Sequence, residues 1–287
     1  MKYRPYTLKN YHKIPQLKFL PETAISDMDA VGRVLPFKTN NYVVDELIDW
    51  DNYENDPLFA INFPQKKLMD RKHFDLISGL LKSGADDSVI IQAVDGIRLG
   101  LNPHPAGQLE CNVPELGGSK LSGIQHKYSE TMLVFPAQGQ TCHAYCTFCF
   151  RWPQFTGMSD YKMALKQAEV SAEYLKRHPE ITDVLFSGGD PMVMNASRLE
   201  IYIDALLNSD FSNLRTIRIG TKSLSFWPYR YLTDKDSEKI LELFRKVTDY
   251  GIHLSIMAVS YTHLRAHETT SHISYAVDCM KSWGGGG

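Results

Sequence analysis

The sequence has few cysteines, little net charge and no long hydrophobic run. Only 5 of its 287 residues are cysteines, which is too few for the disulfide framework of a small secreted protein. The formal net charge of −2 offers no basic excess for nucleic acid. No apolar stretch reaches the roughly 18 residues that span a membrane, and no signal-peptide core follows the first residues. We therefore expect a soluble, cytoplasmic protein that binds neither nucleic acid nor membranes.

Three of the cysteines, Cys142, Cys146 and Cys149, stand together with the spacing C-x3-C-x2-C. Four-iron clusters normally take four thiolate ligands, so three thiolates in one loop leave one iron open to an external ligand. We interpret this loop as the ligand set of a [4Fe-4S] cluster. Zinc stays open as an alternative, because His143 lies within the loop and zinc takes four cysteine or histidine ligands. A set of buried thiols is a third interpretation.

From residue 131 onward, short apolar runs alternate with amphipathic stretches. We expect strands at residues 132–136, 183–186, 214–219 and 253–258, and helices at 164–177, 197–207 and 234–250. Ser197 is the expected cap of the second of these helices. The alternation predicts a parallel sheet or barrel of the α/β class, with the loops after the strands on one face. Residues 1–125 show no long strand pattern and are expected to form an α-rich cap.

Two glycines and a carboxylate, Gly188-Gly189-Asp190, come soon after the expected strand at 183–186. Glycine lets the backbone approach a ligand closely and adopt positive φ. The plainer alternative is a tight strand-to-helix turn that Asp190 caps. Arg151, two residues after the last cysteine of the loop, offers a guanidinium that can hold a carboxylate through two parallel hydrogen bonds. An ordinary surface arginine is the alternative there.

The cysteine spacing is similar to that of the radical S-adenosylmethionine (SAM) enzymes, and further landmarks resemble the lysine 2,3-aminomutase family. These landmarks are residues 123–128, the cysteine loop, residues 183–190 and residues 217–222. The resemblance implies a partial (β/α) barrel of the TIM type with an N-terminal α-helical extension. It implies an isomerase in which a [4Fe-4S] cluster cleaves SAM reductively. A 5′-deoxyadenosyl radical would then drive a 1,2-amino shift on an amino acid held by pyridoxal phosphate (PLP).

The resemblance also implies roles for single residues. Phe148 matches the position that packs near the adenine of SAM, with local core packing as the alternative. Arg151 matches the arginine that binds the substrate carboxylate, and Lys127 matches one of two arginines that bind the PLP phosphate. The residues that match the loop in contact with the SAM amino group are Ser187, Gly188, Gly189 and Asp190. The implied partners are a small-molecule amino acid and a flavodoxin- or ferredoxin-like electron donor, and a homo-oligomer is left open.

Three departures separate the chain from the family pattern. After the third cysteine the family has a run of arginines, whereas this chain continues from Arg151 with Trp152-Pro153. The second PLP-phosphate position carries Thr131. Residues 259–287 show no family match, and we expect a foreign or frame-shifted tail on a truncated chain. The expected regions are therefore residues 1–125, 126–258 and 259–287, in a chain that binds a cluster but does not turn over unless another chain completes it.

Two other hypotheses stay open at this point. A PLP-independent radical SAM enzyme with another substrate fits the Trp152-Pro153 substitution and the missing counterpart of the family lysine that binds PLP. A non-catalytic module that binds a cluster or zinc fits the cysteine loop alone. Free lysine, a related amino acid and a protein-bound lysine are all compatible with these residues as the substrate.

Overall fold

The protein is described from a computed structural model, which describes residues 1–101, 112–147, 149, 151–157, 163–208 and 213–258. By its internal contacts the chain divides into two compact units. The sheet unit contains residues 1–2, 106–142 and 162–287, and the helical unit contains residues 3–105 and 143–161. The three regions expected from the sequence stay a prediction.

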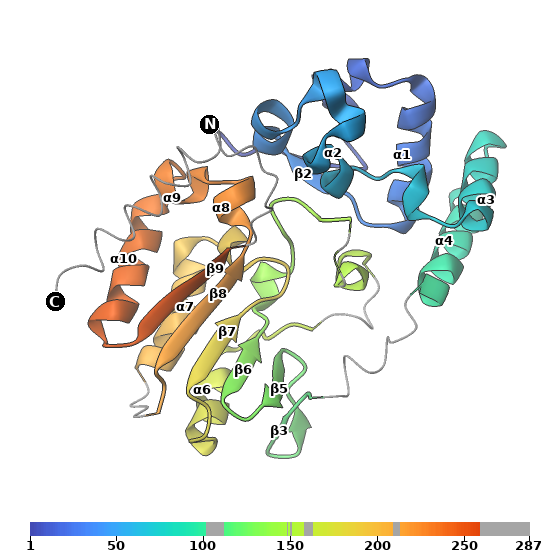
Figure 1. The fold of residues 1–287 in the computed structure, drawn as a ribbon. Coiled ribbons are helices and arrows are strands. Elements are labelled where there is room, and N and C mark those ends of the chain that lie inside the picture. Colours follow the sequence, from blue (N-terminus) through green and yellow to red (C-terminus); the bar gives the residue numbers. More distant parts are fainter. Residues whose placement is uncertain (102–111, 148, 150, 158–162, 209–212, 259–287) are drawn as a thin grey trace. The chain divides into compact units, whose positions relative to one another are not determined.

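The sheet unit is built on a five-stranded sheet with the strand order β5-β6-β7-β8-β9 (Figure 1). Strands β6 to β9 run parallel, and β5 pairs antiparallel with β6. The strands are β5 Ile124–Tyr128, β6 Thr131–Val134, β7 Asp183–Phe186, β8 Thr216–Thr221 and β9 His253–Ala258, and a hairpin of β3 Glu115–Leu116 and β4 Ser119–Lys120 precedes them. The fold is therefore mixed α/β with a largely parallel sheet, and closure into a barrel stays a prediction.

Helices follow the strands of the sheet unit, and the longer ones cover one face of the sheet (Figure 1). They are α6 Ala168–Arg177, α7 Ala196–Leu207, α8 Ser223–Phe226, α9 Tyr229–Leu232 and α10 Ser237–Asp249, with short 3-10 turns η6 Ala137–Gly139 and η9 Pro191–Val193. Successive side chains of a strand point to opposite faces. The side chains on the covered face are fully buried in β6, β7 and β8; they are Met132, Val134, Val184, Phe186, Ile217 and Ile219, each 0% exposed.

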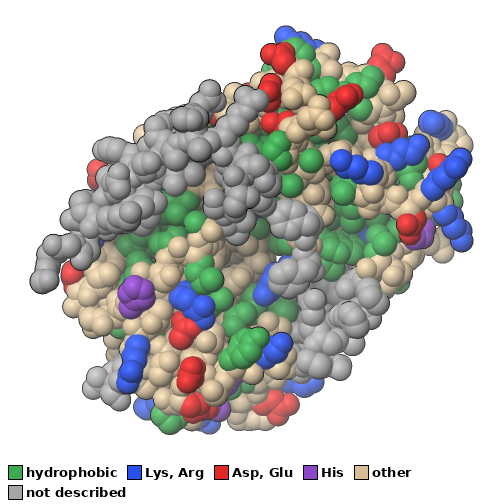
Figure 2. Space-filling view, in the orientation of Figure 1, with side chains coloured by type: hydrophobic (Ala, Val, Ile, Leu, Met, Phe, Trp, Pro, Cys, Tyr) green, Lys and Arg blue, Asp and Glu red, His purple; other side chains and the backbone are tan. Residues whose placement is uncertain are grey.

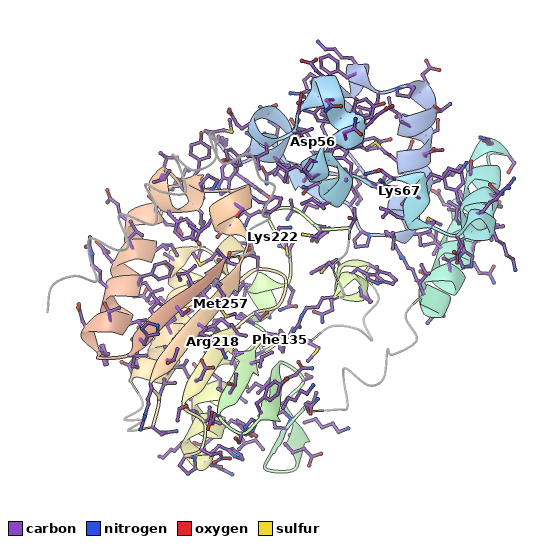
Figure 3. The ribbon with its side chains drawn as sticks, in the orientation of Figure 1. Asp56, Lys67, Phe135, Arg218, Lys222 and Met257 are labelled. Carbon is purple, nitrogen blue, oxygen red and sulfur yellow. The ribbon has the colours of Figure 1, made fainter. Side chains whose placement is uncertain are left out.

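The opposite face of the sheet is half-buried and carries charge. Arg218 of β8 forms an ion pair with Asp183 of β7, and the same carboxylate accepts a hydrogen bond from Thr131 Oγ1 at 3.0 Å. Arg218 Nη1 lies 3.7 Å from the Sδ of Met257 on β9 (Figure 3). The space-filling view shows hydrophobic, acidic and basic side chains side by side over these strands (Figure 2). Arg218 and Asp183 are partly buried on the sheet and so lose part of their hydration, and pairing with each other offsets this loss.

Most predicted elements of the sheet unit are present with shifted ends. The strands at residues 183–186 and 253–258 are confirmed residue for residue, and the strand expected at 214–219 lies two residues further on. The helix expected from residue 164 begins at Ala168, and the one expected from residue 234 begins at Ser237. Helix starts are therefore the least accurate part of the prediction.

The prediction that Ser197 caps α7 is wrong. Asn195 caps this helix, because its Oδ1 accepts a hydrogen bond from Arg198 N at 2.9 Å. The first helical residue, Ala196, donates its N–H to Asp236 Oδ2 at 2.6 Å. A carboxylate from the start of α10 thus satisfies an N–H at the start of α7, and no local sequence pattern shows such a contact.

The described part of the helical unit contains α-helices and one small sheet. The helices are α1 Glu22–Val34, α2 Pro57–Asn62, α3 Arg71–Lys82 and α4 Asp87–Leu101, and β1 Pro5–Thr7 pairs antiparallel with β2 Lys38–Asn40. Shorter helical turns are η1 Tyr11–Lys13, η2 Pro15–Phe19, η3 Val43–Leu47, η4 Trp50–Asn55, η5 Lys66–Leu68 and η7 Trp152–Phe155. Asp56 caps α2 by accepting from Phe59 N at 2.7 Å (Figure 3). Among the described helices of the chain, none combines the length and the apolar composition needed to cross a membrane.

Candidate functional site

The loops that follow three parallel strands meet at one end of the sheet. Asp190, in the loop after β7, donates its N–H to the carbonyl of Gly139, in the loop after β6, at 3.0 Å. The Asp190 carboxylate accepts from Thr221 Oγ1 at 2.7 Å and from Lys222 N at 3.0 Å, where β8 ends. The convergence expected at the carboxyl ends of parallel strands is therefore confirmed for these three loops.

The two glycines of the β7 loop are required by close packing against the segment that leads into the cysteine loop. A Cβ at Gly189 would lie 2.5 Å from Thr141 N, a backbone atom that cannot move aside cheaply. Gly188 has a φ of +138°, and a Cβ there would lie 2.6 Å from Gln140 Nε2. The loop predicted to contact SAM thus touches the residues directly before Cys142.

Asp190 is fully buried and begins the turn η9. Its Oδ1 accepts from Met192 N at 2.9 Å, which is the capping contact that the sequence left open as an alternative. With the donors from Thr221 and Lys222, the carboxylate receives three hydrogen bonds. Ser187, one residue past β7, donates its N–H to the β6 backbone at 2.9 Å. Contact of residues 187–190 with SAM stays a prediction.

None of the three cysteines of the loop forms a disulfide with another described residue. Cys142 is buried and belongs to the sheet unit, whereas Cys146 and Cys149 are half-buried and belong to the helical unit. Over the described residues, no three histidine, cysteine, aspartate or glutamate side chains form a group that could hold a metal ion. Three thiols do match the donors that an open four-iron cluster needs, in kind and in number. Because of this match, the cysteines stay predicted cluster ligands. Phe148, the residue predicted to lie near the adenine, lies outside the described residues.

Hydrogen bonds hold the backbone on both sides of Cys146. Tyr145 N donates to the carbonyl of Lys38 at 2.7 Å, and Thr147 N donates to the carbonyl of Ile61 at 2.8 Å. Both acceptors come from the N-terminal part of the helical unit. The N-terminal residues therefore support the second half of the cysteine loop directly, which the sequence did not reveal.

Arg151 comes directly after the cysteine loop, immediately before η7, and is half-buried. Burial lowers the pKa of its guanidinium, and the charge of the Cys149 thiolate counteracts this shift. Electrostatic attraction strengthens where water is excluded, so these surroundings suit the predicted carboxylate contact. Gln154, three residues further on, is 6% exposed, and neither of its amide atoms has a hydrogen-bond partner in the described part of the chain. Sequence reasoning missed this residue, because a buried glutamine has no local signature.

The residues at the two PLP-phosphate positions do not form a phosphate site. Lys127 on β5 is exposed, and its Nζ lies 5.5 Å from the ring centroid of Tyr128. Thr131 on β6 donates its hydroxyl to the carboxylate of Asp183. A phosphate with about two negative charges is held best by several converging donors or by a guanidinium fork, and one exposed ammonium supplies neither. These residues therefore do not fit PLP.

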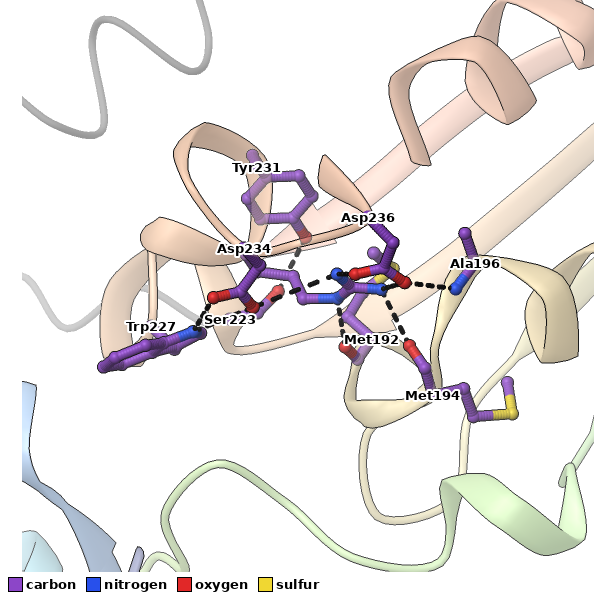
Figure 4. A network of polar contacts seen from close by, with 9 residues as sticks. Met192, Met194, Ala196, Ser223, Trp227, Tyr231, Asp234 and Asp236 are labelled. Carbon is purple, nitrogen blue, oxygen red and sulfur yellow. Dashed lines mark hydrogen bonds and ion pairs between the residues drawn. The ribbon is translucent and has the colours of Figure 1, made fainter. Parts of the chain in front are cut away.

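Arg230 of α9 fixes the segment that follows Asp190, and the sequence did not single it out. The residue is 4% exposed. Its Nε donates to the carbonyl of Met192 at 2.9 Å and its Nη2 to that of Met194 at 2.8 Å (Figure 4). The guanidinium also donates to both carboxylate oxygens of Asp236, at 2.6 and 3.1 Å. Burial raises the pKa of Asp236, but the hydrogen bonds and charge of Arg230 outweigh it, so the net shift is downward.

Comparison with known proteins finds several relatives that are named L-lysine 2,3-aminomutase. A provisionally named L-lysine 2,3-aminomutase of Aquifex aeolicus is 30% identical over 280 residues, which cover 96% of this chain and 62% of that protein. The L-lysine 2,3-aminomutase of Acetoanaerobium sticklandii is 33% identical over 146 residues, 50% of this chain and 33% of that protein. The enzyme of the same name from Escherichia coli is 24% identical over 196 residues, 67% of this chain and 49% of that protein. No model of a protein family matches the chain.

The chain spans less than two thirds of the length of each of these relatives. The similarity to the Aquifex aeolicus protein nevertheless extends through nearly all of this chain, well beyond the short motifs from which the resemblance was drawn. The resemblance is thereby confirmed, and the chain is a homologue of the lysine 2,3-aminomutases.

Proposed function

We propose that the protein is a radical SAM enzyme of the lysine 2,3-aminomutase type, which catalyses a 1,2-shift of an amino group on an amino acid. Homology to aminomutases supports the reaction class. The observation that carries the proposal is the packing of Gly188 and Gly189 on Gln140 and Thr141, immediately before Cys142. It joins the loop expected to bind SAM to the start of the loop expected to bind the cluster.

In this proposal each motif has one task. The thiolates of Cys142, Cys146 and Cys149 hold a [4Fe-4S] cluster and leave one iron for the amino and carboxylate groups of SAM. When bound, the cluster supplies the electron that cleaves SAM reductively, and the resulting 5′-deoxyadenosyl radical starts the amino shift. The backbone of residues 187–189 contacts the amino end of SAM. Arg151 binds the substrate carboxylate through its guanidinium fork.

A PLP-independent radical SAM reaction is the second candidate, and one observation favours it. Lys127 is exposed and Thr131 is bonded to Asp183, so the two PLP-phosphate positions offer a single cation. No step in our proposal passes through PLP. In the second candidate the cluster and the SAM loop act as above, and the migrating group on the substrate is not an amine held by PLP.

The partners belong to the proposal as well. A small-molecule amino acid is the substrate, and a flavodoxin- or ferredoxin-like protein delivers the electron to the cluster. Cysteines must be reduced to bind iron, which favours a cytoplasmic location. A homo-oligomer would shield the radical chemistry from water.

Anaerobic reconstitution tests the function directly. The purified chain is loaded with iron and sulfide, reduced with dithionite in the presence of SAM, and analysed for 5′-deoxyadenosine. We expect a four-iron EPR signal and 5′-deoxyadenosine from the native chain. A variant with Cys142, Cys146 and Cys149 changed to serine should show neither, whereas Cys111→Ser, which alters a cysteine outside the loop, should retain both.

Other results would point to the competing hypotheses. Tightly held zinc without iron, or a cluster that never cleaves SAM, would favour the non-catalytic module. Cleavage of SAM with no visible absorbance change on addition of PLP, and no isomerised lysine, would favour the PLP-independent enzyme. Isomerised lysine together with 5′-deoxyadenosine would support the aminomutase.

A further inference from the structure

A continuous chain of buried side-chain hydrogen bonds links Tyr231 of α9 to Asp190. Tyr231 OH lies 2.6 Å from Ser223 Oγ, Ser223 Oγ lies 2.7 Å from Thr221 Oγ1, and Thr221 Oγ1 lies 2.7 Å from Asp190 Oδ1. Each of the four side chains is at most 3% exposed. We name this set of four residues the hydroxyl relay.

The donors and acceptors of the hydroxyl relay can have only one direction. An ionised carboxylate accepts and never donates, so Thr221 Oγ1 gives its proton to Asp190. Thr221 Oγ1 must then accept a hydrogen bond from Ser223 Oγ, and this bond takes the only proton of the Ser223 hydroxyl. Ser223 Oγ in turn accepts from Tyr231 OH. Burial, and then the charge of Asp190, raise the pKa of Tyr231, so the phenol stays a neutral donor.

The residue before Tyr231, Arg230, also holds this loop. Arg230 donates to the carbonyls of Met192 and Met194, two and four residues after Asp190 (Figure 4). Two consecutive residues of α9 therefore hold the loop after β7. Tyr231 acts on the Asp190 carboxylate through the hydroxyl relay, and Arg230 binds backbone carbonyls of the loop. Chains of hydrogen bonds in a dry interior polarise one another and restrict geometry more than isolated bonds do.

We propose that Tyr231 is a positioning residue for SAM, which acts through the hydroxyl relay on the loop that contains Asp190. Asp190 is fully buried and its carboxylate receives three donors, so it anchors the loop from inside. The backbone of residues 187–189 is thereby held in one conformation and meets the amino end of SAM. This inference rests on the proposed function, because it assumes that SAM is the ligand.

Tyr231→Phe tests the relay, and Tyr174→Phe is its matched control. Both changes remove one hydroxyl from a tyrosine of the sheet unit that is 3% exposed; the hydroxyl of Tyr174 bonds His126 Nδ1 at 2.7 Å on a different part of the sheet. The full chain is reconstituted with iron anaerobically, and its affinity for SAM is measured by equilibrium dialysis. Amide hydrogen exchange is followed in peptides that contain Met192 and Lys222, whose N–H groups donate to Asp190.

We expect Tyr231→Phe to bind SAM about five-fold more weakly, which is the effect of one lost hydrogen bond. Its Met192 and Lys222 amides should exchange faster, and its iron content should match that of the native chain. Tyr174→Phe should change neither affinity nor exchange. Ser223→Ala breaks the relay at its centre and should reproduce Tyr231→Phe, so it replaces that variant if the latter does not fold.

Three results would overturn the inference. They are an unchanged SAM affinity in both relay variants, an equal loss in Tyr174→Phe, and unchanged exchange of the Met192 and Lys222 amides. A native chain that binds a cluster but no SAM would instead refute the proposed function. The exchange measurement would still decide whether Tyr231 holds the loop, because it needs no ligand.

Discussion

Substitution of Gly189 by alanine is the sharpest test of how the two candidate loops meet. The added methyl would lie 2.5 Å from Thr141 N, and the atoms in its way are backbone atoms. Real Cβ atoms do not approach this closely, so either the β7 loop or the segment before Cys142 must move. Gly220, at the end of β8, provides a matched control. A Cβ there would meet nothing closer than the carbonyl of Phe186 at 3.5 Å, an ordinary contact.

The cost follows from the packing. Forcing extra volume into a well-packed site costs typically about 1–3 kcal/mol, and here no flexible side chain can absorb the strain. For a chain of this size each kcal/mol lowers the melting temperature by about 2–4 °C, so Gly189→Ala should lower it by roughly 2–12 °C. Gly220→Ala should change it by no more than about 2 °C, because alanine fits and reduces the entropy of the unfolded chain.

Calorimetry and iron analysis together check this prediction. Gly189→Ala should melt earlier and bind less iron per chain, because the segment that carries Cys142 is displaced. Gly220→Ala should keep the native melting temperature and iron content. Equal melting temperatures for the two variants would refute the reasoning, since the close contact at Thr141 would then carry no energetic weight. A stable Gly189→Ala chain with native iron content would refute the link between the loops.

Further predictions concern the polar groups around the same loop. Asp190→Asn places an amide NH2 against an N–H donor, so the free energy of unfolding measured with denaturant should fall by about 1–3 kcal/mol. An unchanged free energy of unfolding would contradict the three hydrogen bonds to Asp190. A lysine at position 230 cannot bind two carbonyls and a carboxylate at once, so Arg230→Lys should lower the free energy of unfolding by about 1–3 kcal/mol. An Arg→Lys change on the surface should leave it almost unchanged. The pKa of Asp236 lies below its ordinary value of 3.8, so its stabilising effect is present above that pH and is lost as the pH falls through the folded-state pKa. Asp236→Asn should therefore be less stable at neutral pH and lose less of its stability in acid; an identical acid transition would show that Asp236 does not contribute.

The order of strands and helices in the sheet unit could be predicted because each element has a local signal. Short apolar runs that end in glycine-containing loops mark β7 and the strands beside it, and amphipathic spacing marks the helices. Strand β5 was not predicted, because its sequence, Ile124–Tyr128, has only one buried apolar residue and lies at the edge of the sheet. The start of α7 was misplaced because Asn195 and the distant Asp236 determine it together.

Part of the candidate site could be predicted from the sequence, and part could not. Its general location could be predicted, because loops after parallel strands always gather at one end of the sheet. Its internal contacts could not. Nothing in the sequence relates Tyr231 to Asp190 or Gly189 to Thr141, since these pairs come from loops and helices that only the fold brings together. The sequence also allows two interpretations of the motif aspartate, capping and cofactor binding, and the hydrogen bond that it accepts from Met192 N shows that it caps.

The cysteine loop shows why the N-terminal residues matter to the candidate site. An α-rich cap expected from composition could be a removable cover, but the carbonyls of Lys38 and Ile61 accept hydrogen bonds from the residues on either side of Cys146. An isolated backbone N–H in a half-buried loop would otherwise need water or another acceptor. The loop conformation that carries two of the three predicted cluster ligands therefore depends on segments about 100 residues away in the sequence, β2 and α2. The spacing of the cysteines alone therefore does not determine the conformation of this loop, because hydrogen bonds to those two segments hold it.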